Sequence, residues 1–346
     1  MAIPIENIYF LLSYAWNKLE EKNRVQVSTD DKTQVLDLLA KVLVTATQRI
    51  LKRGIDKNYI DHTEEMASIK GKIELSQTIK KKLLCKQRAI CTYNDLSSNI
   101  ITNQIVVSTL YRLSRTQGLD STLVKDVLRL QNMFLGVDVI HLNQRDFSKF
   151  KLNRNNRFYG FLLDVCYLIF INTLPAENPG YFTFSDFTRD ERKMNQLFEA
   201  FLRNFYQIEQ KDYSSVKRED ITWQFAPQDH QSNLYLPKMQ TDVTLESVTQ
   251  KIIIDAKFYK ETMLLHYDKE KVRSDHLYQL FSYLLNQEDG SDKTLNATGI
   301  LLYPTTEKAY KADFRYNNHF IKIRTVNLNA HWQEITHNLL SLIKED

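Results

Sequence analysis

One short segment of the chain carries acidic residues at a spacing that suits metal-dependent hydrolysis. It runs from residue 239 to residue 257 and is typical of two strands joined by a two-residue turn at Val248-Thr249. In that hairpin Asp242 lies directly opposite Asp255, with Cβ atoms about 5 Å apart, where like charges repel. A Mg²⁺ ion between the two carboxylates would compensate this repulsion, because Mg²⁺ binds a few carboxylate oxygens together with water and phosphate.

Strand alternation adds a lysine to the two acids. Asp255 and Lys257 are two residues apart and therefore share a face, about 6.6 Å along the strand, whereas Ile252 and Ile254 point the other way, into a core. Two carboxylates and an ammonium suit phosphodiester hydrolysis, in which the metal activates water and Lys257 orients it or stabilises the developing charge. We therefore predict Asp242, Asp255 and Lys257 as catalytic residues, with Asp242 and Asp255 as the Mg²⁺ ligands.

The acid-x-lysine pattern alone is weak evidence. It also occurs at 20–22, 30–32 and 191–193, where it is typical of solvated surface. Only the pattern at 255–257 ends an apolar, β-branched run and has an acid at the matching position of the preceding strand. That combination favours a catalytic site over a surface ion pair.

Two predicted helices add supporting residues. Gln279 and Tyr283 lie on one face of a helix expected at 275–285, because they are four residues apart. The pair would line the DNA-binding edge of the cleft, although a half-buried helix face fits the same spacing. Within a helix expected at 190–209, Glu199 has apolar neighbours, and a buried glutamate needs a partner. An outer metal ligand and a capping or surface role fit Glu199 equally.

The elements around these residues predict an α/β protein of two domains. No proline occurs between Pro4 and Pro175, so a domain at 1–174 is free to be mainly helical, with a small β element. We expect a second domain at 175–346, an α/β domain with a central mixed sheet. Its predicted strands are 221–226, 240–246, 251–257, 297–303 and 321–326, and its closing helix is 332–343.

A basic segment interrupts the helices of the first domain. Residues 54–95 include the alternating stretch Ile69–Leu75 and predict extended or hairpin structure with a basic surface. The lysines of this surface are Lys70, Lys72, Lys80, Lys81 and Lys82. Contact with a partner or with DNA, and a solvated loop without a partner, fit these lysines equally.

Composition narrows the class of protein. The chain has 346 residues, 43% hydrophobic and 25% charged, as an ordinary folded protein has. A net charge of +4 permits nucleic-acid binding without requiring it. Its three cysteines form no C-x-x-C pair, which argues against a disulfide framework and favours the cytoplasm. The sequence lacks a signal peptide, a membrane-spanning apolar run and a phosphate-binding G-x-x-x-x-G-K-[ST] loop, so we expect no membrane contact and no nucleotide bound by this chain itself.

Five segments match one known family in order and spacing over nearly the whole chain. They are Asn7-Ile-Tyr-Phe-Leu-Leu-Ser-Tyr-Ala-Trp16, Ile69-Lys-Gly-Lys-Ile73, Thr241-Asp242, Asp255-Ala-Lys257 and Leu277-Tyr-Gln-Leu280. In these segments the chain resembles the McrC family, the nuclease subunit of McrBC-type 5-methylcytosine-specific restriction systems.

The resemblance implies a PD-(D/E)xK endonuclease domain at the C-terminus, with Asp242, Asp255 and Lys257 as its catalytic set. Gln279 and Tyr283 fit the Q-x-x-x-Y helix of related nucleases, and Thr241 stands where the family usually has proline. The N-terminal domain would dock on the ring of an McrB-like AAA+ GTPase and stimulate it.

The resemblance also implies that this partner reads the modified cytosine in double-stranded DNA, and that DNA translocation triggers cleavage. A non-catalytic adaptor that binds DNA or activates the partner is the alternative, and the intact catalytic set argues against it. A stand-alone nuclease is a third possibility, which the large helical first domain disfavours.

Overall fold

The computed structural model describes residues 3–16, 34–150, 152, 156, 159–226, 231–259, 264–266, 269–306 and 309–344. The chain divides into two compact units. The helical unit comprises Leu36–Ser185, and the sheet unit comprises Met1–Val35 together with Asp186–Asp346. The sequence placed the boundary at 174/175 and the first helix in the N-terminal domain, whereas the division falls after Ser185 and the first helix belongs to the sheet unit.

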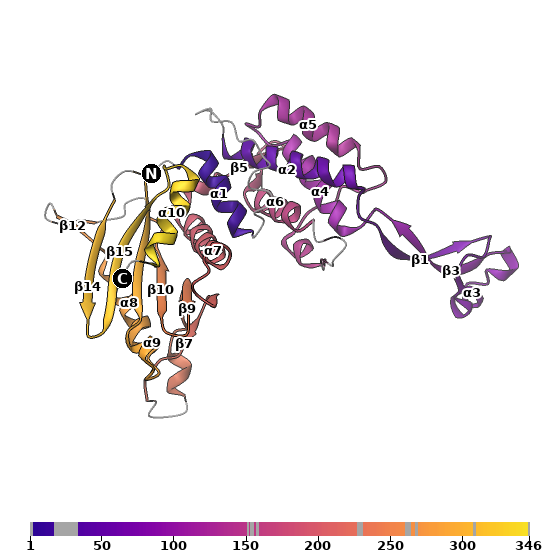
Figure 1. Cartoon of the computed structure of the whole chain (residues 1–346). Helices are drawn as coiled ribbons and strands as arrows, with labels where there is room; N and C mark the ends of the chain where they lie inside the picture. The colour runs from indigo at the N-terminus through magenta and orange to yellow at the C-terminus, as the bar shows by residue number, and fades with distance from the viewer. Residues whose placement is uncertain are drawn as a thin grey trace. The chain divides into compact units, whose positions relative to one another are not determined.

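The sheet unit is built around a mixed sheet of six strands in the order β14-β15-β13-β10-β9-β6, seen in Figure 1. β10 pairs parallel with β13, and β13 pairs parallel with β15, whereas the other neighbours pair antiparallel. The predicted α/β class with a central mixed sheet is confirmed. The strands are β6 (Ser215–Lys217), β9 (Val243–Glu246), β10 (Lys251–Ala256), β13 (Thr298–Thr305), β14 (Lys311–Tyr316) and β15 (His319–Asn327).

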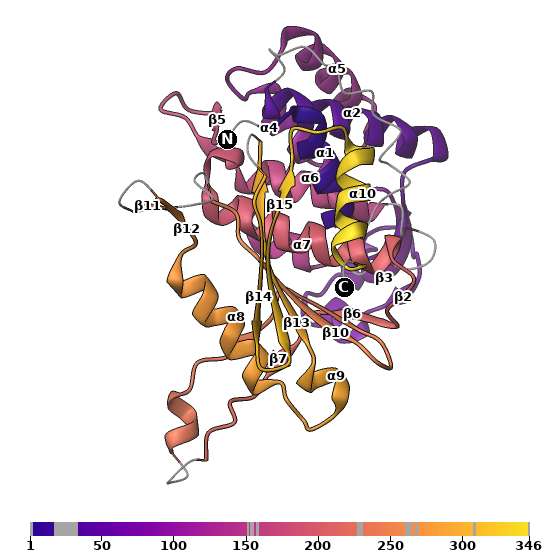
Figure 2. The same cartoon turned by 60° about the vertical axis from the view of Figure 1, so that its left-hand side comes forward.

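Helices cover both faces of this sheet. α8 (Ser274–Asn286) lies on one face, and α7 (Glu191–Glu209) and α10 (Trp332–Leu342) lie on the other (Figure 2). Because both faces are covered, β10 is buried along its whole length, and three isoleucines in succession, Ile252–Ile254, form its centre. Asp190 begins α7 by accepting hydrogen bonds from the backbone N–H groups of Arg192 and Lys193.

The first helix, α1 (Ile5–Ala15), packs on α7 within the sheet unit. Its Phe10 and Tyr14 contact Phe201 of α7, with ring centroids 5.4 and 5.6 Å apart. Asn7 is buried and donates to the carbonyls that follow β15, those of Leu328 and Ala330. The apolar face of α1 therefore completes the core of the sheet unit, although α1 lies far in sequence from α7 and from the residues after β15.

The helical unit contains four longer helices and a projecting arm. The helices are α2 (Val35–Arg53), α4 (Ile101–Ser114), α5 (Ser121–Asn132) and α6 (Tyr159–Ile171). β1 (Asn58–Met66) and β3 (Ala89–Ser97) pair antiparallel along their full length, and they form a long arm that carries α3 (Leu75–Lys80) at its far end (Figure 1). β2 (Lys72–Ile73) pairs with β3 inside the arm. Gly71 has a φ of +72°, and a Cβ there would lie 2.4 Å from the Thr92 carbonyl oxygen, so glycine is required.

The remaining elements are short. They are β4 (Thr173–Pro175), β5 (Phe182–Phe184), β7 (Asp220–Ile221), β8 (Met239–Gln240), β11 (Leu264–His266), β12 (Lys269–Lys271), α9 (Asp292–Leu295) and the 3-10 turns η2 (Leu84–Lys86), η3 (Gln144–Ser148), η4 (Phe187–Arg189) and η5 (Ser232–Tyr235). Across the described residues, no helix is long and apolar enough to cross a membrane. Cys91 and Cys166 are buried free thiols, and Cys85 is an exposed one.

Two strand predictions were too long. Of the stretch expected at 221–226, only Ile221 is in a strand, because β7 pairs with β8 over two residues in a small separate sheet and ends there. In the arm, only Lys72–Ile73 of the alternating stretch Ile69–Leu75 is a strand, because Leu75 begins α3. β14 and β6 lie at the two edges of the sheet, and the sequence did not predict them.

Candidate active site

The hairpin of β9 and β10 has the register that the sequence predicted. Paired residues run from Lys251↔Glu246 to Ile254↔Val243, and the N–H of Ser247 donates to the carbonyl of Gln250 across the turn at 2.9 Å. The next step of this register brings Asp242 and Asp255 to the end of the ladder. The backbone pairing stops there, and the side chain of Asp242 takes its place: its Oδ2 accepts from the N–H of Ala256 at 2.9 Å.

Both carboxylates are buried beside one another. Asp242 is 7% exposed and Asp255 is 1% exposed. Asp255 Oδ2 lies 2.9 Å from Lys257 Nζ. The carbonyl of Asp242 accepts from Arg203 Nη1 of α7 at 3.4 Å. The three residues predicted as the catalytic set therefore meet at the C-terminal end of β10.

The electrostatics of the pair are those of crowded, buried acids. Burial raises the pKa of Asp255 to about 7, because the charge of Lys257 offsets burial only in part and the charge of Asp242 adds to it. Burial also raises the pKa of Asp242, and the hydrogen bond from the N–H of Ala256 lowers it by less. For Lys257, burial acts to lower the pKa, but the ion pair with Asp255 outweighs it and the pKa is raised. The site therefore keeps its lysine charged and ionises its acids with difficulty unless a further cation is present.

A chain of hydrogen bonds links Lys257 to α8. Lys257 Nζ donates to Gln279 Oε1 at 2.7 Å, and Gln279 Nε2 donates to the Tyr283 hydroxyl at 2.7 Å. The Tyr283 hydroxyl donates to the carbonyl of Gln240 at 2.9 Å, two residues before Asp242. Gln279 and Tyr283 thus share a helix face beside Lys257, as their spacing predicted, and they tie both acid-bearing strands to one helix.

Glu199 faces the same site from α7. Its Oε1 accepts from Asn195 Nδ2 at 2.5 Å, and its Oε2 lies 3.6 Å from Arg218 Nη2. Burial and the nearby charge of Asp242 raise the pKa of Glu199 to about 7. Glu199 is therefore part of the carboxylate cluster and is neither a helix cap nor a free surface residue.

Several residues at the site were missed by sequence reasoning. Asn195 Oδ1 accepts from the N–H of Phe258 at 2.7 Å and so holds the chain just after Lys257. Arg203 and Arg218 place guanidinium groups near Glu199 and Asp242. His276 is buried on α8, where its Nδ1 lies 2.8 Å from the Tyr303 hydroxyl. No motif marks these residues, because only the folding of α7 and α8 onto the sheet brings them to the acids.

The five lysines of the basic segment are not part of this site. They belong to the arm of the helical unit, where Lys70 lies 3.8 Å from Asp95 and 3.9 Å from the ring centroid of Tyr93. Lys72 lies 3.3 Å from Glu74. The other three lie exposed at and after the end of α3: Lys80, Lys81 and Lys82.

The donor set fits a hard divalent cation. Within the described ranges, no group of three or more His, Cys, Asp or Glu side chains has the geometry to hold a metal on its own. Asp242 and Asp255 offer two buried carboxylates whose ionisation burial opposes, and Mg²⁺ commonly takes only one or two carboxylates and completes its shell with water and phosphate. The residues present therefore match Mg²⁺ better than a metal that needs a full protein cage.

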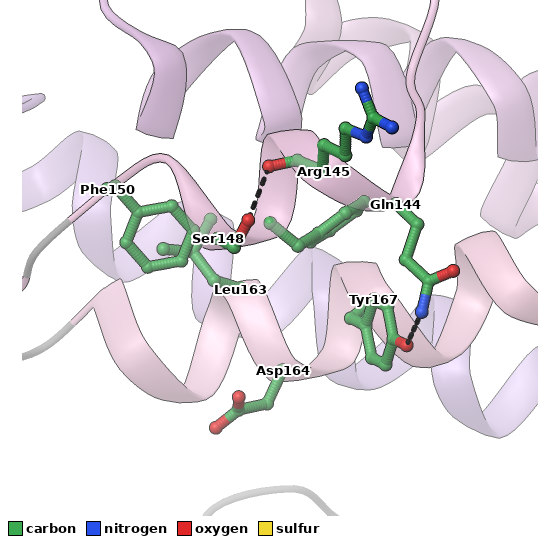
Figure 3. Close-up of a pocket in the computed structure, with 8 residues that line it drawn as sticks. Gln144, Arg145, Ser148, Phe150, Leu163, Asp164 and Tyr167 are labelled. Atoms are coloured by element: carbon green, nitrogen blue, oxygen red, sulfur yellow. Dashed lines mark hydrogen bonds between the residues drawn. The ribbon is translucent and has the colours of Figure 1, made fainter.

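A hollow in the helical unit differs in character from this acidic site. It has a volume of about 440 Å³ and lies between η3 and α6 (Figure 3). Aromatic side chains, among them Phe147 and Tyr167, line it, and Gln144 Nε2 donates to the Tyr167 hydroxyl at 3.3 Å. Among the described residues that line it, Asp164 is the one carboxylate, so this part of the lining does not match the pair of acids at Asp242 and Asp255.

Fold and site together define an α/β protein with a carboxylate–lysine cluster at the end of a central strand. A model of the family described as "McrBC 5-methylcytosine restriction system component" matches residues 6–304. The chain is also 33% identical, over 99% of its length and 98% of the relative's, to an Escherichia coli K12 protein described as "Type IV methyl-directed restriction enzyme EcoKMcrBC". The chain belongs to this McrBC family, and the family predicted from the sequence is confirmed.

A solved structure shows the same fold. A refined half-complex from a tetradecameric assembly of Thermococcus gammatolerans McrB AAA+ hexamers with bound McrC contains a chain that matches with a TM-score of 0.59 at 16% identity, over 99% of this chain and 76% of that one. A second structure, of the T. gammatolerans McrBC complex, matches over 61% of this chain and 60% of that one, with a TM-score of 0.43 at 17% identity.

Proposed function

We propose that this chain is the Mg²⁺-dependent DNA endonuclease subunit of a methylcytosine-dependent restriction complex. In this proposal it works with a GTP-hydrolysing AAA+ ring of the McrB type, which it stimulates and which activates it. The observation that carries the nuclease assignment is the buried cluster of Asp242, Asp255 and Lys257 at the end of one hairpin. Family membership and the complexes named for its relatives support the partner and the modified DNA target.

Asp242 and Asp255 would hold Mg²⁺, with Glu199 as an outer carboxylate. A bound Mg²⁺ would polarise the scissile phosphate and lower the pKa of a water molecule. Lys257 has three N–H donors, and its contacts with Asp255 and Gln279 leave at least one for the attacking water or a phosphate oxygen. Gln279 and Tyr283 keep the ammonium in place, which fits a positioning role for the predicted Q-x-x-x-Y pair.

We assign partner docking to the arm formed by β1, β3 and α3. Three apolar side chains near its far end are exposed, Leu75 by 60%, Ile79 by 61% and Leu84 by 60%. Exposed apolar groups on one small element suit burial against another protein. Lysines of the same element would add charge contacts with the ring or with DNA, namely Lys70, Lys72, Lys80, Lys81 and Lys82. If charge reversal at residues 80–82 left stimulation of the partner unchanged, these lysines would have no such role.

The function is tested by cleavage of methylated and unmethylated plasmid DNA with Mg²⁺ and GTP, with and without the AAA+ partner, and with Asp255→Ala as the control. We expect cleavage of methylated DNA only, and only with partner, GTP and intact Asp255. Stimulation of GTP hydrolysis by the variant shows that it still folds and docks. No cleavage by either protein, with normal stimulation by both, would replace the nuclease with a non-catalytic adaptor.

A further inference from the structure

The strand that carries Asp242 is offset by one residue at the position of Asp242. β6 pairs with β9 up to Lys217↔Thr244. The next backbone contact between the two strands joins Glu219 to Thr241. Between these two contacts the chain that follows β6 has one residue, 218, whereas the chain that leads into β9 has two, Asp242 and Val243. Two residues opposite one is the arrangement of a β-bulge, which redirects side chains and is common beside active sites.

Thr241 closes the bulge with both its backbone and its side chain. Its N–H donates to the Glu219 carbonyl at 2.9 Å, and its Oγ1 accepts from the Glu219 N–H at 3.0 Å. In a regular antiparallel pair the N–H of Glu219 would donate to a backbone carbonyl. Here it donates to the hydroxyl of Thr241, which takes the place of that carbonyl where the backbone pairing stops. The side chain of Thr241 is fully buried, which excludes water as a substitute acceptor.

A contact along the strand confirms the offset. Thr241 Oγ1 lies 2.9 Å from Thr244 Oγ1. Side chains three residues apart on a regular strand point to opposite faces, so these two hydroxyls meet only because the bulge turns the chain between them. The same turn directs Asp242 inward, where its Oδ2 reaches the N–H of Ala256.

The partner of this closure is itself fixed to β10. Glu219 Oε1 lies 3.1 Å from Lys251 Nζ, and Lys251 is 6% exposed. Lys251 is the first residue of β10 and lies on the same face of that strand as Asp255, four residues later. Glu219 therefore connects the base of one acid-bearing strand to the bulge that presents the other acid.

We propose that Thr241 is a positioning residue for Asp242: its hydroxyl and N–H hold the bulge against Glu219 and so fix the distance between the two carboxylates. The expected effect on cleavage rests on the proposed nuclease function, whereas the expected effect on the position of Asp242 does not. A side chain of the same shape as threonine but without a hydroxyl would fill the same space and lose the hydrogen bond from the N–H of Glu219. Thr241→Val is therefore the informative change, because valine has nearly the shape of threonine and no acceptor.

The experiment compares wild type with Thr241→Val, Thr241→Ser and Thr109→Val. Thr109 is a matched control, because it is fully buried in the helical unit, where its hydroxyl donates to the carbonyl of Ile105 at 2.7 Å. Each full-length protein is assayed with the AAA+ partner and GTP for cleavage as a function of Mg²⁺ concentration and for GTPase stimulation. Crystal structures of wild type and Thr241→Val give the position of the Asp242 carboxylate.

We expect Thr241→Val to need about tenfold more Mg²⁺ for half-maximal cleavage, as is usual when a group that orients a metal ligand is lost. Thr241→Ser should restore the wild-type Mg²⁺ dependence, Thr109→Val should keep it, and all variants should stimulate the GTPase normally. In the Thr241→Val crystal, Asp242 Oδ2 should have left the N–H of Ala256.

An unmoved Asp242 together with an unchanged Mg²⁺ dependence would overturn the inference. If wild type itself does not cleave, the proposed function fails, and the position of Asp242 in the two crystals still decides whether Thr241 positions it.

Discussion

Replacing Asp255 by asparagine is expected to stabilise the metal-free protein at alkaline pH. Burial raises the pKa of Asp255 from 3.8 to about 7, whereas the unfolded chain keeps the ordinary value. An acid whose pKa is higher in the folded state costs stability when it ionises, so stability is lost as pH rises from about 4 through about 7. At 1.36 kcal/mol per pKa unit, the loss above pH 7 is about 4 kcal/mol.

Asparagine keeps the shape of the side chain and removes the charge. The attraction between Asp255 and Lys257 is already included in the raised pKa of Asp255. We therefore expect Asp255→Asn to be about 2–4 kcal/mol more stable than wild type at pH 8 and close to it at pH 5. Saturating Mg²⁺ should remove most of the difference, because the cation stabilises the ionised, folded wild type.

The assay is urea unfolding in EDTA at pH 5 and pH 8, followed by tryptophan fluorescence. Trp16, Trp223 and Trp332 are the three tryptophans of the chain, and all belong to the sheet unit, so the signal reports that unit. Asp220→Asn is the control: hydrogen bonds from Lys238 and Gln240 lower the pKa of this exposed acid, so its removal should change stability in the opposite direction. Parallel pH profiles for wild type and Asp255→Asn would show that the pKa of Asp255 is not raised in the folded protein.

Three further changes test the packing around the site. Gln279→Ala removes the acceptor for Lys257 from an exposed position, so cleavage should fall about tenfold while the unfolding free energy stays within about 0.5 kcal/mol; a normal rate would deny Gln279 its role. Gly299→Val places a Cβ 2.9–3.0 Å from two leucines of α8 and should cost about 1–3 kcal/mol in urea unfolding. Asn7→Ala leaves two carbonyls without their donor and should cost about 2–3 kcal/mol; unchanged stability would show that α1 is not needed by the sheet unit.

The parts of the site that sequence predicted are those set by local rules. The apolar run before Asp255 and the turn after Ser247 fix the hairpin register, because side-chain alternation allows only one pairing that buries the run. The four-residue spacing of Gln279 and Tyr283 likewise predicts a shared helix face, and their contact with Lys257 needed only that this helix cover the adjacent strand.

The parts that sequence could not predict depend on long-range contacts. Arg203 and Arg218 reach the acids from a helix and a strand end that carry no motif. The bulge at Asp242 depends on a partner, Glu219, more than twenty residues earlier, and alternation gives no sign of it. The first helix was assigned to the wrong half of the chain for the same reason, because its apolar face shows that it is buried and does not show against what.

We propose that DNA is cut at the cluster of Asp242, Asp255 and Lys257. The first measurement is the rate of methylated-DNA cleavage by Lys257→Met in complex with the AAA+ partner, with Mg²⁺ and GTP, beside the GTPase rate of the same complex. We expect cleavage to fall about 10³-fold with GTP hydrolysis unchanged, since a charge that stabilises the transition state in a buried site contributes several kcal/mol. Cleavage at the wild-type rate would contradict it and place the chemistry elsewhere.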